Sequence, residues 1–432
     1  MRRLGATPGA ALVAGSLALV LVLAPPGLPA APARATSTPP PTPVPPNGSP
    51  SPFPTVLTTP RPSLNPPPLG SPSAILEDLR TGQVLYAKGA DGRRPIASLT
   101  KVMTALVVLS KTSPDDIVTV DGTAARQPGS ILGLRVGERI TVRELLFALL
   151  VQSSNDAAVA LAEHVGGTVP GFVSMMNRRA SRMGLFHSHF TDASGLDKGG
   201  YSSARELAVM ARAAYESPLF AKIVQTKFHD VPAPSGPARH IQNRNVLLWL
   251  YPGGIGVKTG FTSSAGHCLI AAAERLDTRL LAVALGASGP EDGGVFNDAA
   301  ALLNYGFAAF EERALIHAGD PLGSFTVEGM EVPVVAGATL LRLVRHDQVD
   351  QATLSILPDA TVRLPVTAGE PVGRVVVEVA GVRVGAVPTV AAASVTQSPP
   401  APPPELPRPE NPLERGWRLL RALIQAVLGP FL

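Results

Sequence analysis

The chain has 432 residues, 45% of them hydrophobic and 16% charged, which is enough for one large folded domain and a smaller one. Its formal net charge is only +4, and no basic tract interleaved with aromatic residues is present, so nucleic acid is not an expected partner. The single cysteine, Cys268, excludes an intrachain disulfide, and its apolar neighbours indicate a buried strand position.

The N-terminus has the pattern of an export signal. Arg2 and Arg3 precede an apolar run at 10–24, and small residues at 33–35 offer a cleavage site before Thr36. We expect a signal peptide over 1–35. A retained N-terminal anchor is the alternative, although the run is short for a bilayer span. In either case the body of the protein is exported.

Residues 36–73 are dominated by Pro, Ser and Thr and form a semi-rigid linker without a core. The folded part is expected to begin at Ala74. Apolar runs at 74–76 and 84–86 flank a turn at 80–82, which predicts a β-hairpin.

A Ser and a Lys lie three residues apart at Ser98 and Lys101, at the start of an apolar run. The residues that follow at helical spacing are Val102, Met103, Leu106 and Leu109. Ser98 is therefore expected near a helix N-terminus, with Lys101 on the same face. A serine hydroxyl becomes a nucleophile when a neighbouring base takes its proton, and a buried amine can do this. Taken alone, the pair fits an N-cap serine followed by a solvated lysine better.

Helical periodicity continues beyond this segment, at 141–151, 157–164 and 169–183. Residues 153–156, with the sequence Ser-Ser-Asn-Asp, are therefore expected in a connection between two helices. Ser202 or Ser203 is a candidate cap for a helix over 204–215.

The pattern changes at Lys258, Thr259 and Gly260. The runs at 265–273 and 279–286 are alternating or fully apolar, which predicts antiparallel core strands before a helix at about 295–310. We expect Lys258 and Thr259 on a strand edge that faces the start of the Ser98 helix and forms one wall of a cleft.

The chain from residue 313 to the C-terminus divides into three parts. Short strand-like runs at 361–364, 375–379 and 382–384 predict a small β-domain, and 393–412 is a Pro-rich linker. Residues 413–432 predict an amphipathic helix. Its polar face holds Glu414, Arg418, Arg421 and Gln425, and its apolar face holds Trp417, Leu420, Ile424 and Val427. A helix lying in the membrane interface is favoured, and docking on the protein's own body is the alternative.

Three motifs occur in order: Ser-x-x-Lys at Ser98, Ser-x-Asn at Ser153 and Lys-Thr-Gly at Lys258. In this combination the chain resembles low-molecular-mass penicillin-binding proteins, specifically secreted serine-type D-alanyl-D-alanine carboxypeptidases. The resemblance extends from about Ala74 to the C-terminus. It includes further segments at 133–138, 145–150, 191–196, 243–245 and 265–269.

The resemblance implies an α/β (α+β) fold, in which an antiparallel sheet is flanked by helices as in serine β-lactamases and DD-peptidases. A catalytic domain is expected over 74–312. It is followed by the small C-terminal β-domain over 313–392, to which the resemblance assigns a spacer or interaction role, and by a membrane-anchor helix over 413–432.

The resemblance also assigns roles to the motif residues. Ser98 attacks the carbonyl between the two terminal D-alanines of a cell-wall stem peptide, with Lys101 as its base. Lys258, across the cleft, is expected to help keep Lys101 neutral by like-charge repulsion. Ser153 passes the proton to the leaving amine, and Asn155 hydrogen-bonds to Lys101 and the substrate amide.

The backbone N–H groups of Ser98 and Phe261 are expected to form the oxyanion hole. The Lys-Thr-Gly strand, with Gly260 as its third motif residue, binds the substrate. Its terminal carboxylate is received by Lys258, Thr259 and Arg244. Because an arginine between two asparagines is also typical of a structural fork that holds a loop, this alternative stays open for Arg244.

The expected partners are peptidoglycan stem peptides ending in D-Ala-D-Ala, β-lactam inhibitors and, through the C-terminal helix, the membrane surface. The expected location is the extracellular face of the bacterial cytoplasmic membrane. No cofactor and no metal are expected, since the histidines lack the spacings typical of metal hydrolases.

Two other hypotheses remain: a serine β-lactamase, and a weakly active penicillin-binding protein that attaches to the wall. The β-lactamases that share these motifs need a Glu for deacylation. The candidates between Asn155 and Lys258 are Glu163, Glu206 and Glu216, and none is followed by Leu-Asn at the typical spacing. Two departures from the family pattern, Ile255 in place of an acid and Gly at 200 in place of His, leave substrate preference open.

Overall fold

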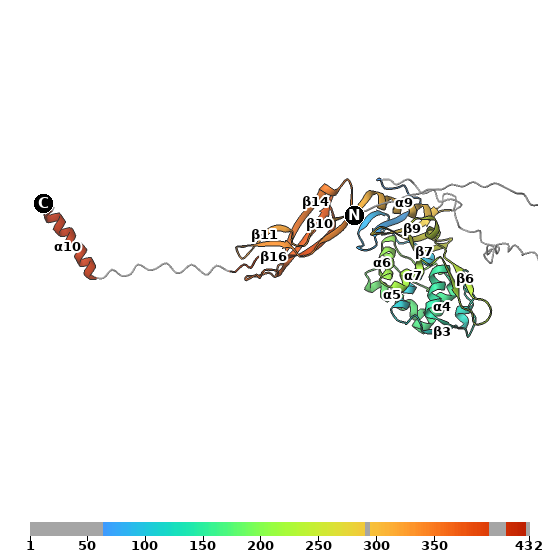
Figure 1. Ribbon diagram of the computed structural model, residues 1–432. Helices are drawn as coiled ribbons and strands as arrows, with labels where there is room; N and C mark the ends of the chain where they lie inside the picture. Colours follow the sequence, from blue (N-terminus) through green and yellow to red (C-terminus); the bar gives the residue numbers. More distant parts are fainter. Residues whose placement is uncertain (1–63, 290–293, 397–411, 429–432) are drawn as a thin grey trace, which may run out of the picture. The chain divides into compact units, whose positions relative to one another are not determined.

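The computed structural model describes residues 64–289, 294–396 and 412–428. The expected signal peptide at 1–35 and most of the expected linkers at 36–73 and 393–412 lie outside the described residues. Along the chain, Figure 1 shows a segment rich in helices, then a segment of strands, then a final helix.

A five-stranded antiparallel sheet forms the centre of the first segment. In spatial order its strands are β2 (Val84–Lys88), β1 (Ser73–Asp78), β9 (Thr278–Ala287), β8 (Gly266–Arg275) and β7 (Gly254–Thr262). The predicted hairpin is the β1–β2 pair, and the two predicted core strands are β8 and β9, so both predictions are confirmed. The strand that carries Lys258 is β7, and it forms one edge of the sheet.

Helices cover both faces of this sheet. They are α1 (Thr100–Leu109), α2 (Gly122–Ala125), α3 (Val142–Phe147), α4 (Asn155–Gly166), α5 (Val169–Arg182), α6 (Ala204–Tyr215), α7 (Pro218–Val224), α8 (Leu247–Leu250) and α9 (Gly294–Ala309). Two short hairpins accompany them, β3 (Ile117–Thr119) with β4 (Arg139–Thr141), and β5 (Phe228–Val231) with β6 (Arg239–Gln242).

Strand β9 shows how the two faces are buried. Leu281, Val283 and Leu285 pack into the core that includes α1, α4, α5 and α6, whereas Leu280 and Ala282 pack into the core on the α9 side. Successive strand residues point to opposite faces, so an apolar run buries both. Figure 1 shows α9 on one side of β9 and α6 on the other. The expected α/β (α+β) architecture is confirmed.

Two details around the second motif differ from the expectation. The helix predicted at 141–151 is α3 followed by a π-helical turn at Ala148–Gln152. The connection is also shorter than predicted, because Asn155 and Asp156 already belong to the first turn of α4. At the predicted cap of α6, the Ser203 side chain accepts from the Glu206 N–H.

The β-rich segment contains a two-stranded sheet and a five-stranded sheet. The first pairs β10 (Phe310–Ile316) with β13 (Leu340–Arg345). The second has the order β11 (Pro321–Val327), β12 (Met330–Ala336), β16 (Val382–Ala391), β15 (Pro371–Val379) and β14 (Ala352–Pro358). The strand predicted at 361–364 is wrong. Instead, the Asp359 carboxylate accepts from the N–H and hydroxyl of Thr361, which favours a turn over a strand.

The final helix, α10 (Pro412–Leu428), is close to the predicted amphipathic helix. Leu413, Trp417, Leu419 and Leu420 are exposed on it. Among the residues that the structure describes, no helix is long and apolar enough to cross a membrane.

Candidate active site

Ser98 and Lys101 lie where the prediction placed them, at the start of a helix. A 3₁₀ turn at Ala97–Leu99 leads directly into α1, with Ser98 partly exposed and Lys101 fully buried. The Lys101 ammonium nitrogen lies 2.9 Å from the Ser98 hydroxyl oxygen. The spacing of three residues therefore brings the hydroxyl and the amine into hydrogen-bonding contact.

Two further acceptors hold the Lys101 amine in place. Its Nζ donates to Asn155 Oδ1 at 2.8 Å and to the Ser194 carbonyl at 2.7 Å. Burial lowers the pKa of Lys101 to about 7; Asp192 opposes this shift and Arg244 reinforces it. A large fraction of the amine is therefore neutral near neutral pH and can accept a proton from Ser98.

Asn155 is itself fixed by the loop that precedes α3. Its amide nitrogen donates to the Pro128 carbonyl at 2.8 Å, and its backbone N–H donates to the Ser130 carbonyl at 2.7 Å. The next residue, Asp156, accepts from the backbone N–H groups of 132, 133 and 134. The Ser-x-Asn motif and this loop are thus one hydrogen-bonded unit.

Ser153 is buried and has an unusual backbone. It lies at the end of the π-helical turn with φ of 69°, in the left-handed region that residues other than glycine rarely occupy. Such conformations are concentrated at functional sites. The turn places Ser153 two residues before the Asn155 that contacts Lys101.

Lys258 is buried on the edge strand β7, and its Nζ donates to the Thr259 carbonyl at 2.9 Å. Burial, followed by the charge of Lys101, holds the pKa of Lys258 well below its usual range. Burial is also the main cause of the low pKa of Lys101, with the charge of Arg244 reinforcing it, and the expected help from Lys258 stays a prediction. Like-charge repulsion is reciprocal, so each amine disfavours the charged form of the other.

Gly260 explains how β7 comes so close to Ser98. A Cβ at this position would lie 3.0 Å from the Ile96 carbonyl oxygen and 3.2 Å from the Ser98 nitrogen. The glycine of the Lys-Thr-Gly motif therefore permits the strand backbone to pack against the turn that carries Ser98. The predicted juxtaposition of the strand edge and the helix start is confirmed.

Arg244 shows the fork geometry that the sequence left open. Its Nε donates to the Gln152 carbonyl at 2.8 Å, and one terminal nitrogen donates to the Ser130 hydroxyl at 3.1 Å. Its charge also contributes to the lowered pKa values of Lys101 and Lys258, so it lies within electrostatic reach of both amines. Arg244 therefore links the loop at Ser130 to the end of the π-helical turn at Gln152.

A loop at Asp192–Gly195 holds the third partner of Lys101, and sequence reasoning gave it no role. The Asp192 carboxylate accepts from the Gly195 N–H at 2.6 Å and from the Ser194 hydroxyl at 2.9 Å. Gly195 has φ of +81°, and a Cβ there would lie 1.9 Å from the Ala97 carbonyl oxygen. The Asp-x-Ser-Gly pattern, typical of an Asx turn, was the available signal.

Sequence and structure comparisons place the chain among known proteins. A family model described as D-alanyl-D-alanine carboxypeptidase matches residues 61–289. The carboxypeptidase DacD of Salmonella typhimurium is 40% identical over 273 residues, which cover 60% of this chain and 68% of that protein. DacF of Bacillus subtilis is 35% identical over 56% of this chain and 64% of its own length.

The solved structures include penicillin binding protein 5 from Haemophilus influenzae, with a TM-score of 0.65 and 29% identity over 77% of this chain and 99% of that one. Penicillin binding protein 6B from Escherichia coli has a TM-score of 0.60 and 31% identity over 77% of this chain and 97% of that one. The chain belongs to the D-alanyl-D-alanine carboxypeptidase family. It is a serine peptidase of the penicillin-binding protein class.

In this carboxypeptidase fold, an exposed aromatic side chain follows Gly260 on β7. Phe261, directly after the Lys-Thr-Gly motif, is 60% exposed, and its ring centroid lies 4.5 Å from that of His267 on β8. Cys268, next along β8, is fully buried as predicted, and burial raises the pKa of its thiol to about 11.

The three glutamates considered for a β-lactamase water lie in other parts of the carboxypeptidase fold. Glu206 accepts from the His187 N–H and the Ser188 hydroxyl. Burial and a hydrogen bond to Asp121 raise the pKa of Glu163 to about 7, and Glu216 is exposed at the end of α6. The contacts of Glu163 and Glu206 thus tie them to segments other than the Ser98 turn.

Proposed function

We propose that this carboxypeptidase removes the terminal D-alanine from peptidoglycan stem pentapeptides through an acyl-enzyme on Ser98, and that penicillin acylates the same serine. The observation that carries the proposal is the 2.9 Å contact between the Ser98 hydroxyl and a buried Lys101 whose pKa is about 7. A neutral amine at this distance supplies the general base that a serine nucleophile requires.

Acylation begins when Lys101 takes the Ser98 proton and the hydroxyl oxygen attacks the carbonyl carbon between the two D-alanines. The backbone N–H groups of Ser98 and Phe261 donate hydrogen bonds to the oxyanion. One such donor typically contributes about 3 to 4 kcal/mol of transition-state stabilisation. Ser153 then relays the proton to the leaving amine as the carbon–nitrogen bond breaks. Asn155 orients Lys101 and hydrogen-bonds to the substrate amide.

Lys258, Thr259 and Arg244 bind the terminal carboxylate of the substrate. The β7 backbone beside Gly260 lies along the substrate chain. A bound carboxylate favours the charged form of Lys258 and offsets the burial that otherwise lowers its pKa. After free D-alanine leaves, Lys101 activates a water that attacks the acyl-enzyme and restores Ser98.

A β-lactam meets the same groups with a different outcome. Ser98 opens the lactam ring and Ser153 protonates the ring nitrogen, but the leaving amine stays tethered to the acyl group. It therefore continues to occupy the space that D-alanine vacates after peptide cleavage. This difference makes β-lactams slow-release inhibitors of the peptidase.

The proposed location is the extracellular face of the cytoplasmic membrane. The export pattern at 1–35 supports this location, and so does similarity to D-alanyl-D-alanine carboxypeptidases, since the proposed substrate is a component of the cell wall. We assign catalysis to 74–312, a spacer to the β-domain at 313–392 and attachment to the helix at 413–432. The high amphipathicity of α10, with Trp417 and Leu420 exposed, supports binding at a membrane interface.

D-alanine release tests the proposed activity directly. The purified protein is incubated with a peptide ending in D-Ala-D-Ala, and free D-alanine is measured over many turnovers. Continuous release that stops on addition of penicillin is the expected result. Penicillin binding without any D-alanine release would favour the weakly active wall-attachment protein instead.

A further inference from the structure

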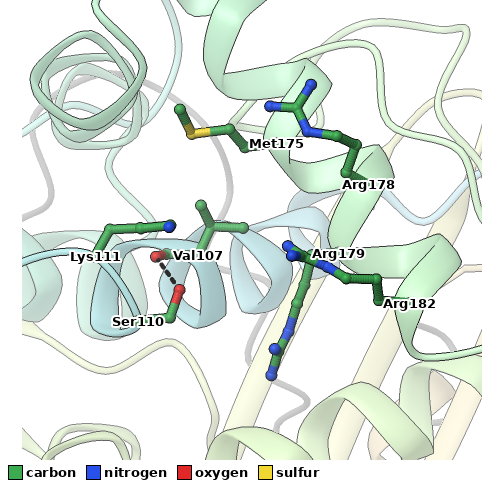
Figure 2. Close-up of a pocket in the computed structure, with 7 residues that line it drawn as sticks. All are labelled: Val107, Ser110, Lys111, Met175, Arg178, Arg179 and Arg182. Carbon is green, nitrogen blue, oxygen red and sulfur yellow. Dashed lines mark hydrogen bonds between the residues drawn. The ribbon is translucent and has the colours of Figure 1, made fainter.

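A cavity of about 150 Å³ lies between the C-terminal end of α1 and helix α5, away from the Ser98 turn. Val107 and Met175 form its apolar lining, and the other walls carry four cationic side chains: Lys111, Arg178, Arg179 and Arg182. Figure 2 shows Lys111 and Arg182 extending toward each other from opposite sides of Val107. We call this the basic cavity.

The four cations have no acceptor in the part of the chain that the structure describes. Within residues 64–289, 294–396 and 412–428, neither a hydrogen bond nor an ion pair involves their side-chain nitrogens. The Nε of Arg179 is shielded from solvent as well as unpaired. Other arginines of the fold are paired, as Arg205 is with Asp91 and Arg239 with Glu138.

The partial negative charges at the C-terminal ends of α1 and α5 offset only part of the positive charge of the four side chains. Each helix C-terminus carries a partial charge of roughly −0.5, so α1 and α5 together offset about one of the four cations. One carbonyl near the end of each helix also has a donor already. The Val107 carbonyl accepts from the Ser110 hydroxyl at 2.8 Å, and the Ala180 carbonyl accepts from the Leu185 N–H at 3.0 Å.

We propose that the basic cavity binds a phosphate group, carried either by a soluble molecule or by a lipid headgroup. Four cations held close together repel one another, and an anion relieves this repulsion. A phosphate monoester carries about −1.5 to −2 charge at pH 7, more than a single carboxylate, and its oxygens suit the planar fork of arginine. The cavity volume is adequate for one such group.

This site is separate from the chemistry on Ser98. Ser98 precedes α1 (Thr100–Leu109), whereas Lys111 follows it, so the length of the helix, roughly 15 Å, lies between them. Substitutions in the basic cavity are therefore expected to leave D-alanine release unchanged. This makes peptide hydrolysis a convenient test that each variant is folded.

The test compares two charge-matched double variants of the full chain. Lys111→Gln with Arg182→Gln removes two cations from the cavity, and Lys222→Gln with Arg383→Gln removes two exposed cations elsewhere. Each protein is titrated calorimetrically with inorganic pyrophosphate and with acetate at constant ionic strength. In parallel, each is sedimented with phosphatidylcholine vesicles that contain or lack phosphatidic acid.

Saturable pyrophosphate binding that weakens about tenfold or more in the cavity variant, but not in the control, is the expected result. If only the vesicles containing phosphatidic acid distinguish the two variants, the phosphate belongs to a lipid headgroup. Equal behaviour of cavity variant and control in both arms would overturn the proposal. Acetate binding as tight as pyrophosphate binding would overturn the assignment to phosphate.

Discussion

The protonation state of Lys101 is the single most sensitive property of the site. An ordinary lysine with a pKa near 10.4 is almost fully charged at neutral pH and cannot act as a base. Burial lowers the pKa of Lys101 to about 7, and three acceptors hold the amine beside Ser98. The same side chain is thus both available as a base and fixed in position.

This pKa predicts the pH dependence of acylation. Because the neutral amine is the active form, the rate of penicillin acylation should rise as pH passes through about 7 and level off above it. Arg244→Gln removes a cation that lowers this pKa, so the midpoint should move to higher pH. Stopped-flow acylation between pH 5.5 and 9 measures the midpoint in the unmodified protein and in Arg244→Gln. Arg383→Gln, which removes a cation far from the site in sequence, is the control. A midpoint that stays fixed, or falls, in Arg244→Gln would contradict the electrostatic assignment.

Ser98 is predicted to be the acylated residue. It combines the contact to Lys101 with the close approach of the β7 backbone at Gly260. Fluorescent penicillin followed by peptide mapping should label Ser98, and Ser98→Ala should abolish the label. A label on Ser153, or undiminished labelling of the Ser98→Ala protein, would show that the nucleophile is another residue.

At the scale of structural elements, the Asp192–Gly195 loop is expected to position Lys101. It presents the Ser194 carbonyl to Lys101, and it passes so close to Ala97 that only glycine fits at Gly195. Gly184 offers a matched comparison. It has a similar φ of +73°, but a Cβ there would meet nothing within 4 Å.

Gly195→Ala and Gly184→Ala should therefore differ in a defined way. Backbone strain costs each variant about 1 to 2 kcal/mol of stability, and the clash at Gly195 adds roughly another 1 to 3 kcal/mol. Acylation should fall only in Gly195→Ala, because only that change displaces a partner of Lys101. Denaturant unfolding and stopped-flow acylation measure the two effects. Equal acylation rates in both variants would mean that the loop does not position Lys101.

Periodicity predicted most elements because their burial follows a simple pattern. The runs that became β8 and β9 are buried on both faces, and α1 has an apolar face at helical spacing. The π-helical turn at Ala148–Gln152 was not predictable, since it changes the hydrogen-bonding pattern within an apolar run that still looks helical. The strand predicted at 361–364 was wrong because turn chemistry at Asp359 outweighed β-propensity.

The candidate site was predictable to the extent that motifs specify it. Ser98, Lys101 and Asn155 form one hydrogen-bonded cluster, as their spacing and order implied. Sequence indicated a turn at Asp192–Gly195, but it could not reveal that the Ser194 carbonyl contacts Lys101 or that Ser130 contacts Asn155 and Arg244, because tertiary packing determines these contacts. Nor could it rank the causes of the low pKa of Lys101, since burial is a property of the whole fold.

At the scale of the whole molecule, the amphipathic helix α10 is the expected point of membrane attachment. Removing 413–432 should abolish sedimentation with anionic vesicles and leave D-alanine release largely intact, because all the proposed site residues lie between Ser98 and Phe261. Within the full chain, Trp417→Glu on the apolar face should weaken vesicle binding more than Gln425→Glu on the polar face. Undiminished sedimentation of the truncated protein would place the attachment elsewhere in the chain.

We predict that this family member is a peptidase whose acyl-enzyme with penicillin is long-lived. The three candidate glutamates lie in other elements of the fold or at its surface, so water at a penicilloyl Ser98 has no dedicated carboxylate base among them. The peptide acyl-enzyme, in contrast, loses its leaving group as free D-alanine and can turn over with Lys101 alone.

The most direct measurement compares the two turnover rates in one preparation: D-alanine release from a D-Ala-D-Ala peptide, and deacylation of the penicilloyl-enzyme after stopped-flow acylation. Multiple turnovers of peptide alongside slow, near-stoichiometric reaction with penicillin is the predicted result. Rapid multiple-turnover hydrolysis of penicillin, faster than peptide cleavage, would contradict it and identify the protein as a β-lactamase.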